Sequence, residues 1–194
     1  MFANQDPDIV IVGAGAAGIG AARRLAGSGL STLVLEALPR PGGRAWTRKG
    51  AGVPLDLGCG WLHSADRNPW TRIAEETGFT VDRHTPAWGT QFRDLGFSAV
   101  ERESAGRAFA QWNERLAAMP SVRDCAADAL EPADGWTSYL QALSGFISGD
   151  ELERVSARDY AAYDTASTGC NWRVPAGYGT LVAASLPEIG RAHV

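Results

Sequence analysis

A strand, a glycine-rich turn and a helix open this chain in the order that a βαβ unit requires. The β-branched run Ile9–Val12 predicts a short, buried parallel strand. A helix is expected next, over about Ala16–Ala26, because glycines follow it directly. A second strand is expected over Thr32–Leu35, with Glu36 at its carboxyl end. This pattern predicts an α/β fold with a Rossmann-like βαβ unit.

The turn between the first strand and the helix carries three glycines with different physical roles. Gly13 permits the tight turn out of the strand, and Gly15 lets a phosphate group approach the backbone. Gly18 allows the helix to pack close to the strand. The helix N-terminus, with Ala16 and Ala17, offers free N–H groups and a positive dipole end to an anion. The sequence therefore predicts a site for the pyrophosphate of a dinucleotide.

An acidic residue and a second glycine pair indicate which dinucleotide is bound. Glu36 can accept hydrogen bonds from both hydroxyls of a ribose. Gly42 and Gly43 let the next loop lie against the pyrophosphate, where Arg44 offers a permanently charged fork of donors. A nicotinamide-binding unit does not need this second loop, so we expect FAD rather than NAD. The alternative to a cofactor-binding role is a glycine-rich turn followed by a solvated arginine.

Composition and charge argue against several other classes of protein. The net charge of −4 gives no reason to expect nucleic acid or an anionic membrane as a partner. Cys59, Cys125 and Cys170 are widely spaced and form no CxxC pair, so no metal site is expected. The N-terminus lacks the basic region of a signal peptide, and no apolar stretch reaches membrane-spanning length. We therefore expect a cytoplasmic protein.

The same residues resemble the flavin-containing amine oxidase family, which includes monoamine, polyamine and L-amino acid oxidases. The resemblance is dense across residues 8–63 and thin beyond them. It is carried by the segments Ile9–Gly18, Val34–Ala37, Pro41–Thr47 and Leu55–His63, and a further segment, Val174–Leu181, resembles the point where such chains return to the FAD domain.

The resemblance implies an FAD-dependent oxidoreductase that transfers a hydride from a C–N substrate, a small-molecule amine or related compound, to flavin N5. Glu36 and Ala37 would then lie at the adenosine ribose, and Arg44 at the pyrophosphate. The stretch with Gly58, Gly60 and Trp61 would pass close to the isoalloxazine ring. These roles come from the resemblance and not from the spacing of the residues.

The sequence assigns no catalytic residue. His63 is the titratable group in the flavin-facing segment that could touch a substrate, with a hydrogen-bonded loop histidine as the alternative. Family oxidases often place a lysine near flavin N5, but Lys49, the one lysine of the chain, does not match that place. The chemistry would belong mostly to the flavin, while aromatic walls exclude water and favour a neutral amine.

The sequence is expected to divide into three segments with different roles. Residues 1–66 would form the first part of an FAD-binding domain, 67–170 a mainly helical substrate-side insertion, and 171–194 the start of the return to the FAD domain. Within them we expect a helix begun by Asn68 and Pro69 and ended at Gly78, then short strands, three helices, a loop and a final helix. The strands are expected over Phe79–Asp82 and Thr90–Arg93, the helices around Phe109–Leu116, from a cap at Asp134, and over Glu151–Tyr160, the loop over Asp164–Gly169 and the final helix over Thr180–Leu186.

Members of the family that the chain resembles are substantially longer, so we expect a truncated fold. The chain would be a fragment, one half of an enzyme completed by a second chain, or a relic, and would not turn over amines by itself. Two other interpretations remain open. One is a flavin-dependent desaturase or porphyrinogen oxidase, and the other is a non-catalytic FAD-binding fragment or subunit.

Overall fold

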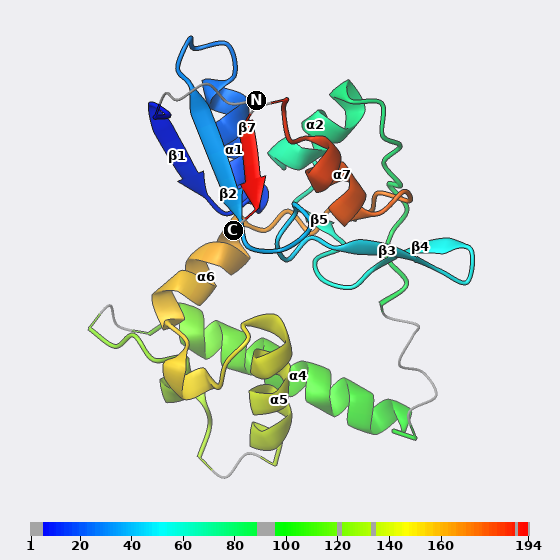
Figure 1. Ribbon diagram of the computed structural model, residues 1–194. Coiled ribbons are helices and arrows are strands. Elements are labelled where there is room, and N and C mark those ends of the chain that lie inside the picture. The colour runs from blue at the N-terminus through cyan, green and yellow to red at the C-terminus, as the bar shows by residue number, and fades with distance from the viewer. Residues whose placement is uncertain (1–5, 89–95, 120–121, 133–134, 189, 194) are drawn as a thin grey trace. The chain divides into compact units, whose positions relative to one another are not determined.

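The structure is a computed structural model that describes residues 6–88, 96–119, 122–132, 135–188 and 190–193. It divides into two packed units. The first unit comprises residues 1–86 and 168–194, and the second comprises residues 87–167. Figure 1 labels most elements of the two units, and each unit is described by itself.

The first unit contains the predicted βαβ arrangement. Strands β1 (Ile9–Val12) and β2 (Thr32–Glu36) run parallel and are joined through helix α1 (Ala16–Leu25). Strand β7 (Gly190–His193) pairs with the other side of β2, also in parallel, so the sheet order is β1-β2-β7. Because parallel strands share one carboxyl edge, the loops that follow β1 and β2 are brought together there.

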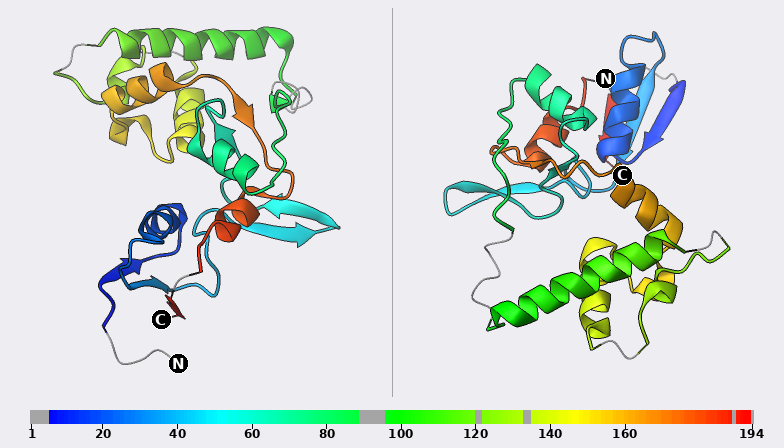
Figure 2. Two further views of the ribbon diagram at one scale, coloured as in Figure 1. Left: turned by 90° about the horizontal axis from the view of Figure 1, so that it is seen from above. Right: turned by 180° about the vertical axis from the view of Figure 1, so that it is seen from behind.

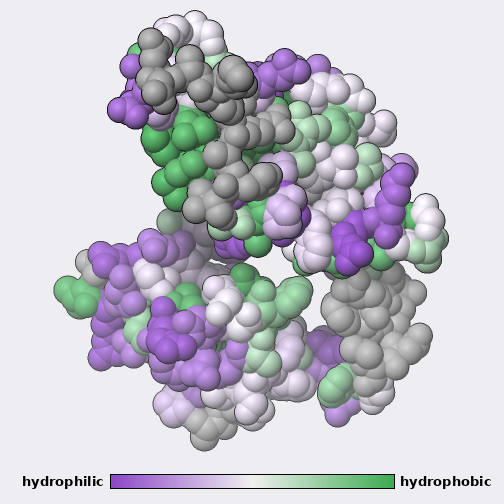
Figure 3. All heavy atoms as spheres, viewed as in Figure 1, coloured by the Kyte–Doolittle hydropathy of each residue, from purple (hydrophilic) through white to green (hydrophobic). Residues whose placement is uncertain are grey.

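Helix α1 covers one face of these three strands, as Figure 2 shows. Ala22 from the helix and Val34 from β2 are buried there, with Ile11 packed against them. Val10 and Val12 belong to the opposite face and are 48% and 85% exposed, and hydrophobic surface lies over β1 in Figure 3. The strand is therefore half-buried and not buried as predicted, because the described residues cover only one face of β1.

Two small antiparallel sheets and two helices complete the first unit, and sequence reasoning did not anticipate the sheets. Their core includes Ile19 from α1 together with Leu62, Leu181 and Val182. The elements are β3 (Thr47–Gly50) with β4 (Val53–Asp56), β5 (Leu62–His63) with β6 (Asn171–Trp172), α2 (Pro69–Glu76) and α7 (Tyr178–Ala184).

Helix α2 begins and ends where the sequence predicts. The side chain of Asn68 accepts a hydrogen bond from the Trp70 amide at 3.0 Å, and Pro69 occupies the first helical position. Gly78 follows the helix with a φ of +78°, a conformation that suits glycine.

The second unit is helical and has its own core. Helix α4 begins with a capping box in which Ser98 and Glu101 bond each other's backbone N–H groups. Trp112 and Leu116 are buried among residues of the other elements, and the Trp112 indole donates to the Ala126 carbonyl at 3.1 Å. The helical elements are α4 (Ala99–Ala117), α5 (Thr137–Ile147), α6 (Ala157–Ala166) and the 3₁₀ turns Ala126–Ala129 and Leu152–Arg154.

Some expected boundaries are wrong. The helix expected over Glu151–Tyr160 is a 3₁₀ turn followed by α6, because the hydroxyl of Ser156 accepts from the Asp159 amide and starts a new helix. Helix α6 therefore runs into the loop expected at Asp164–Gly169. The segment Phe79–Asp82 forms a single bridge, from Asp82 to Arg173, and no strand. The expected strand Thr90–Arg93 and the cap at Asp134 lie outside the described residues.

Candidate cofactor-binding site

The two glycine loops predicted from the sequence lie against each other at the carboxyl edge of the sheet. Gly15 and Gly42 form a parallel bridge, and the Gly42 amide donates to the Ala14 carbonyl at 2.7 Å. The Gly13 amide donates to the Leu35 carbonyl at 2.7 Å, which ties the first loop to the end of β2.

The lack of side chains is what permits this arrangement. A Cβ on Gly18 would lie 1.9 Å from the Gly13 carbonyl oxygen, so only glycine lets α1 pack this close to the turn. A Cβ on Gly43 would lie 3.2 Å from the Gly15 Cα, and Gly43 also has a φ of +58°. The two loops therefore form a cradle of bare backbone, which fits a pyrophosphate that must approach peptide groups closely.

The N-terminus of α1 faces this cradle without a side-chain cap. Gly15 is the residue before the helix and makes no side-chain hydrogen bond, and the first turn carries no acidic residue. Ala16 and Ala17 are exposed. The first N–H groups of a helix have no acceptor within it, so they remain suited to an anionic group.

Glu36 lies beside the cradle, and its carboxylate has a second role that the sequence did not reveal. One oxygen accepts from the Ala14 amide at 2.7 Å and the other from the Leu38 amide at 2.8 Å. The hydrogen bonds from Leu38 and then Ala14 lower the pKa of Glu36 below its ordinary value. The carboxylate thus braces the glycine turn, and each oxygen keeps a lone pair for a further donor such as a ribose hydroxyl. Ala37 is exposed directly after it.

The Arg44 side chain is exposed and forms no ion pair or hydrogen bond with any residue that the structure describes. Its backbone is closely packed instead. The Arg44 carbonyl accepts from the Cys59 amide at 3.2 Å, and a Cβ on Gly58 would lie 1.9 Å from the same carbonyl oxygen. The structure thus brings Gly58 directly against the second glycine loop and leaves the guanidinium of Arg44 available to a ligand.

Asp56 joins distant segments next to this loop, and sequence reasoning missed it. Its carboxylate accepts from the Thr47 hydroxyl at 2.5 Å and from the amides of Tyr178 and Gly179 at 3.0 and 3.3 Å. A Cβ on Gly60 would lie 3.1 Å from the Asp56 Cβ. One signal was present, since Gly177, the residue before α7, has no side chain to cap the helix and leaves its first amides to an acceptor from elsewhere.

Trp61 and His63 lie near the segment that returns to the first unit. The ring of Trp61 is half-buried, with the Arg173 guanidinium 5.5 Å from its centroid. His63 is exposed on β5, and its Nδ1 lies 2.7 Å from Oδ1 of Asn171. This hydrogen bond fits the alternative of a structural loop histidine, and a role of His63 toward substrate stays a prediction.

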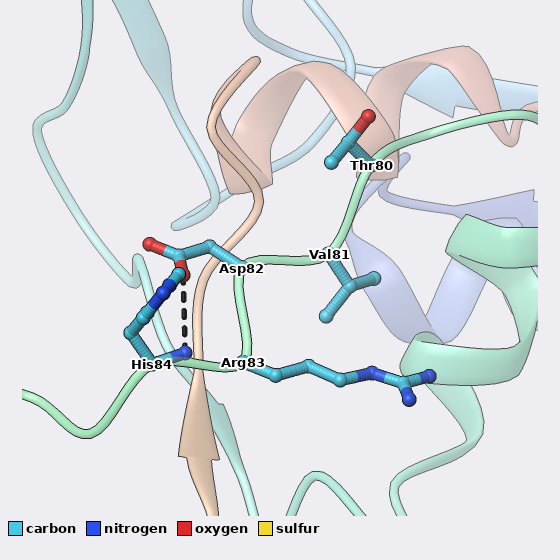
Figure 4. Close-up of a pocket in the computed structure, with 5 residues that line it drawn as sticks. All are labelled: Thr80, Val81, Asp82, Arg83 and His84. Atoms are coloured by element: carbon cyan, nitrogen blue, oxygen red, sulfur yellow. Dashed lines mark hydrogen bonds and ion pairs between the residues drawn. The ribbon is translucent and has the colours of Figure 1, made fainter.

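Elsewhere in the first unit, residues 80–84 line a shallow hollow of about 610 Å³. Figure 4 shows Asp82 and His84 on one side of this segment and Arg83 extending to the other. Asp82 pairs with Arg173 at 2.8 Å and with His84 at 2.6 Å, and these partners lower the pKa of its carboxyl strongly. Arg83 lies over the Trp172 ring at 4.8 Å. Because Asp82 forms an ion pair with Arg173, and Arg83 forms one with Glu75, we assign this hollow a structural role.

The described residues hold no cluster of three or more His, Cys, Asp or Glu side chains that could bind a metal ion. None of their helices is both long and apolar enough to span a bilayer.

A βαβ unit with a glycine cradle and an acid after the second strand is typical of dinucleotide-binding α/β folds. The family model described as flavin containing amine oxidoreductase matches residues 16–162, and the chain belongs to this family. The resemblance drawn from the motifs is therefore confirmed, and membership of a flavin-containing family implies FAD as the cofactor, as expected.

Two curated relatives each align with part of the chain. It is 40% identical over 112 residues to a pseudooxynicotine dehydrogenase of Pseudomonas sp., which is 55% of this chain and 21% of that protein. It is 42% identical over 71 residues to putrescine oxidase of Kocuria rosea, which is 37% of this chain and 15% of that protein.

A solved structure of putrescine oxidase bound to putrescine has the same mixed α/β fold, with a TM-score of 0.62 at 21% identity. The match covers 96% of this chain and 50% of the solved one. The chain therefore spans about half the length of the solved relative, and the aligned parts span 21% and 15% of the two curated relatives above.

Proposed function

We propose that the first unit binds FAD through its two glycine loops, in a Rossmann-like βαβ unit, and serves an amine oxidase-like oxidoreductase. The observation that carries the proposal is the contact between the loops at Gly15 and Gly42, with an ionised Glu36 and an unpaired Arg44 beside it. Residues 1–66 would be the first cofactor-binding segment, 67–170 the substrate-side region and 171–194 the return segment.

Each part of the site has a distinct task. The amides at the start of α1 and the guanidinium of Arg44 would hold the pyrophosphate, and the free lone pairs of Glu36 would accept from the adenosine ribose. Gly58, Gly60 and Trp61 would lie toward the isoalloxazine ring, in a segment that Asp56 holds in place.

The bound flavin would supply the redox chemistry, by accepting a hydride from the carbon that bears the substrate amine. The contribution of this chain is to bind and orient. Glu36 is ionised at neutral pH, and the two backbone amides that bond its carboxylate lower its pKa and stabilise this charge further. Charge-assisted hydrogen bonds to Glu36 and Arg44 would position the adenine end of the cofactor.

We also propose that a further stretch of polypeptide, in the same chain or in a second one, covers the free face of β1. Two observations support this: the exposure of Val10 and Val12, and the match of this chain to half of the solved putrescine oxidase chain. Doubly wound sheets carry helices on both faces. Amines, including polyamines and diamines, are the proposed substrates, on the strength of what the names of the relatives state.

The experiment is to purify the 194-residue chain, titrate it with FAD and with NAD, and follow the visible spectrum and the cofactor released on denaturation. We expect a bound flavin spectrum and no competition from NAD. Binding of NAD in preference to FAD, or no binding of either by folded protein, would refute the proposal. The 194-residue chain alone is expected to release no hydrogen peroxide with monoamines, diamines, polyamines or amino acids. The same assay on the chain together with the polypeptide that completes it would separate amine oxidation from a desaturase or porphyrinogen oxidase reaction.

A further inference from the structure

The second glycine loop is held from one side by an arginine that the sequence analysis gave no role. Arg40 is half-buried, and its guanidinium donates to the Gly43 carbonyl at 2.9 Å. The guanidinium carbon also lies 4.7 Å from the centre of the Trp46 ring. The hydrogen bond and the ring contact together hold the guanidinium in place.

This loop needs such support because of its composition. Gly42 and Gly43 have φ values of +106° and +58°, and glycine loses more conformational freedom on ordering than any other residue. A loop of this kind samples many conformations unless contacts restrict it. The bond from Arg40 fixes the peptide that joins Gly43 to Arg44, the residue that faces the proposed ligand.

Two neighbouring arginines differ from Arg40 in an informative way. Arg48 lies over the same Trp46 ring, 5.8 Å from its centre, but is exposed and donates no hydrogen bond to any residue that the structure describes. Arg44 is exposed and has no such partner either. Of the three, Arg40 is the one that contacts the backbone of the glycine pair.

We propose that Arg40 is a positioning residue for the cofactor site, which keeps the Gly42–Arg44 loop in its binding conformation before the cofactor arrives. The inference rests on the proposed FAD site. Arg40 acts through the Gly43 carbonyl and the Trp46 ring. Because these contacts already order the loop, it loses less conformational entropy when the cofactor binds. Arg44, in contrast, acts by direct contact with the ligand.

The test compares Arg40→Ala with the matched variant Arg48→Ala, which removes the other guanidinium from the same ring. Amide hydrogen exchange by NMR is measured at Gly42 and Ala45 in flavin-free protein, because both amides donate hydrogen bonds within this region. FAD affinity is measured by fluorescence titration. We expect Arg40→Ala to speed exchange at both amides and to weaken FAD binding about tenfold, the effect of losing one hydrogen bond to a charged group. Arg48→Ala should change neither.

Each other outcome has a definite meaning. Weaker binding without faster exchange would overturn the positioning role in favour of a direct effect of the charge, and unchanged binding would also overturn it. Arg40→Lys keeps a charged donor and should recover part of both readouts, which covers the case in which Arg40→Ala does not fold. If wild-type protein fails to bind FAD while exchange still depends on Arg40, the proposed function fails and the loop contact itself remains.

Discussion

The two units of this chain are built by different means. In the first unit several glycines are irreplaceable, because a Cβ on Gly18, Gly58 or Gly177 would overlap neighbouring atoms at 1.9, 1.9 and 2.2 Å. Among the described glycines of the second unit, such as Gly106 and Gly145, none would meet an atom within 4 Å. The second unit is held by apolar side chains on helices instead. Where backbone segments must approach closely, the sequence keeps glycines at fixed spacing, and that motif indicates a binding site. The spacing of apolar residues in the second unit indicates only that helices pack together.

The largest effect should come from the core of the second unit, without loss of cofactor binding. Trp112 is 2% exposed, so Trp112→Ala should destabilise the second unit by about 3–5 kcal/mol, through lost packing and a cavity. Urea unfolding followed by circular dichroism measures this, with Tyr163→Ala, at a position 61% exposed, as the control. A parallel loss of FAD affinity in Trp112→Ala would break the division of roles between the units.

In the first unit, the addition of one methyl group should have nearly as large an effect. Gly18→Ala forces a Cβ against the Gly13 carbonyl and should cost about 2–4 kcal/mol, together with most of the FAD affinity. Gly20→Ala lies in the same helix with open space around it and should stabilise the helix by about 0.5–1 kcal/mol. Equal thermal midpoints for the two variants would show that close packing at Gly18 is not required.

Arg44→Ala should weaken FAD binding by about 1.5–3 kcal/mol, the contribution of a hydrogen bond to a charged group. Because the side chain is exposed and contacts no described residue, the thermal midpoint of the flavin-free protein should not change. Fluorescence titration with FAD measures the affinity, and the loss should be at least as large as in Arg40→Ala. A drop in flavin-free stability would instead indicate a structural role for Arg44.

Glu36→Gln should lower FAD affinity by an amount similar to the loss of one charged hydrogen bond, about 1.5–3 kcal/mol. An amide presents one acceptor oxygen, while Glu36 already accepts from Ala14 and Leu38. The variant should therefore also loosen the glycine turn, visible as faster amide exchange at Ala14, while circular dichroism is unchanged. Since the pKa of Glu36 is lowered, wild-type affinity should hold as the pH falls through 4.5, its ordinary value, and decline only below it. Undiminished flavin occupancy in the variant would contradict the ribose assignment.

The smallest effect should come from one ion-paired acid in each unit. Asp82 pairs with His84 and Arg173, and Asp124 with Arg158 and Ser156, and these partners hold both pKa values far below the ordinary 3.8. A lowered pKa stabilises the fold above the unfolded value and loses that contribution as the pH falls. Asp82→Asn and Asp124→Asn should therefore lower the thermal midpoint slightly at pH 6 and reduce its fall between pH 4 and 2. An unchanged acid slope in either variant would show that the pair does not contribute in solution.

Much of the first unit could be predicted because its signals are local. The run Ile9–Val12 and the glycines after it indicate a strand and a turn within a few residues of sequence. Asn68 and Pro69 likewise marked the start of α2. The errors arose where a boundary depends on a single cap, as at Ser156, or where strands are only two to four residues long, as at Leu62–His63.

By itself, the sequence determined the βαβ unit, the three-part motif of Gly13–Gly18, Glu36 and Gly42–Arg44, and through them the family of the chain. These features depend on backbone conformation and on residue type at short spacing. Only the tertiary structure decided that Glu36 braces the first glycine turn, that Arg40 holds the second, and that Asp56 reaches residues 122 positions later. Such contacts depend on where the chain returns in space, and a single sequence does not record the direction of a side chain.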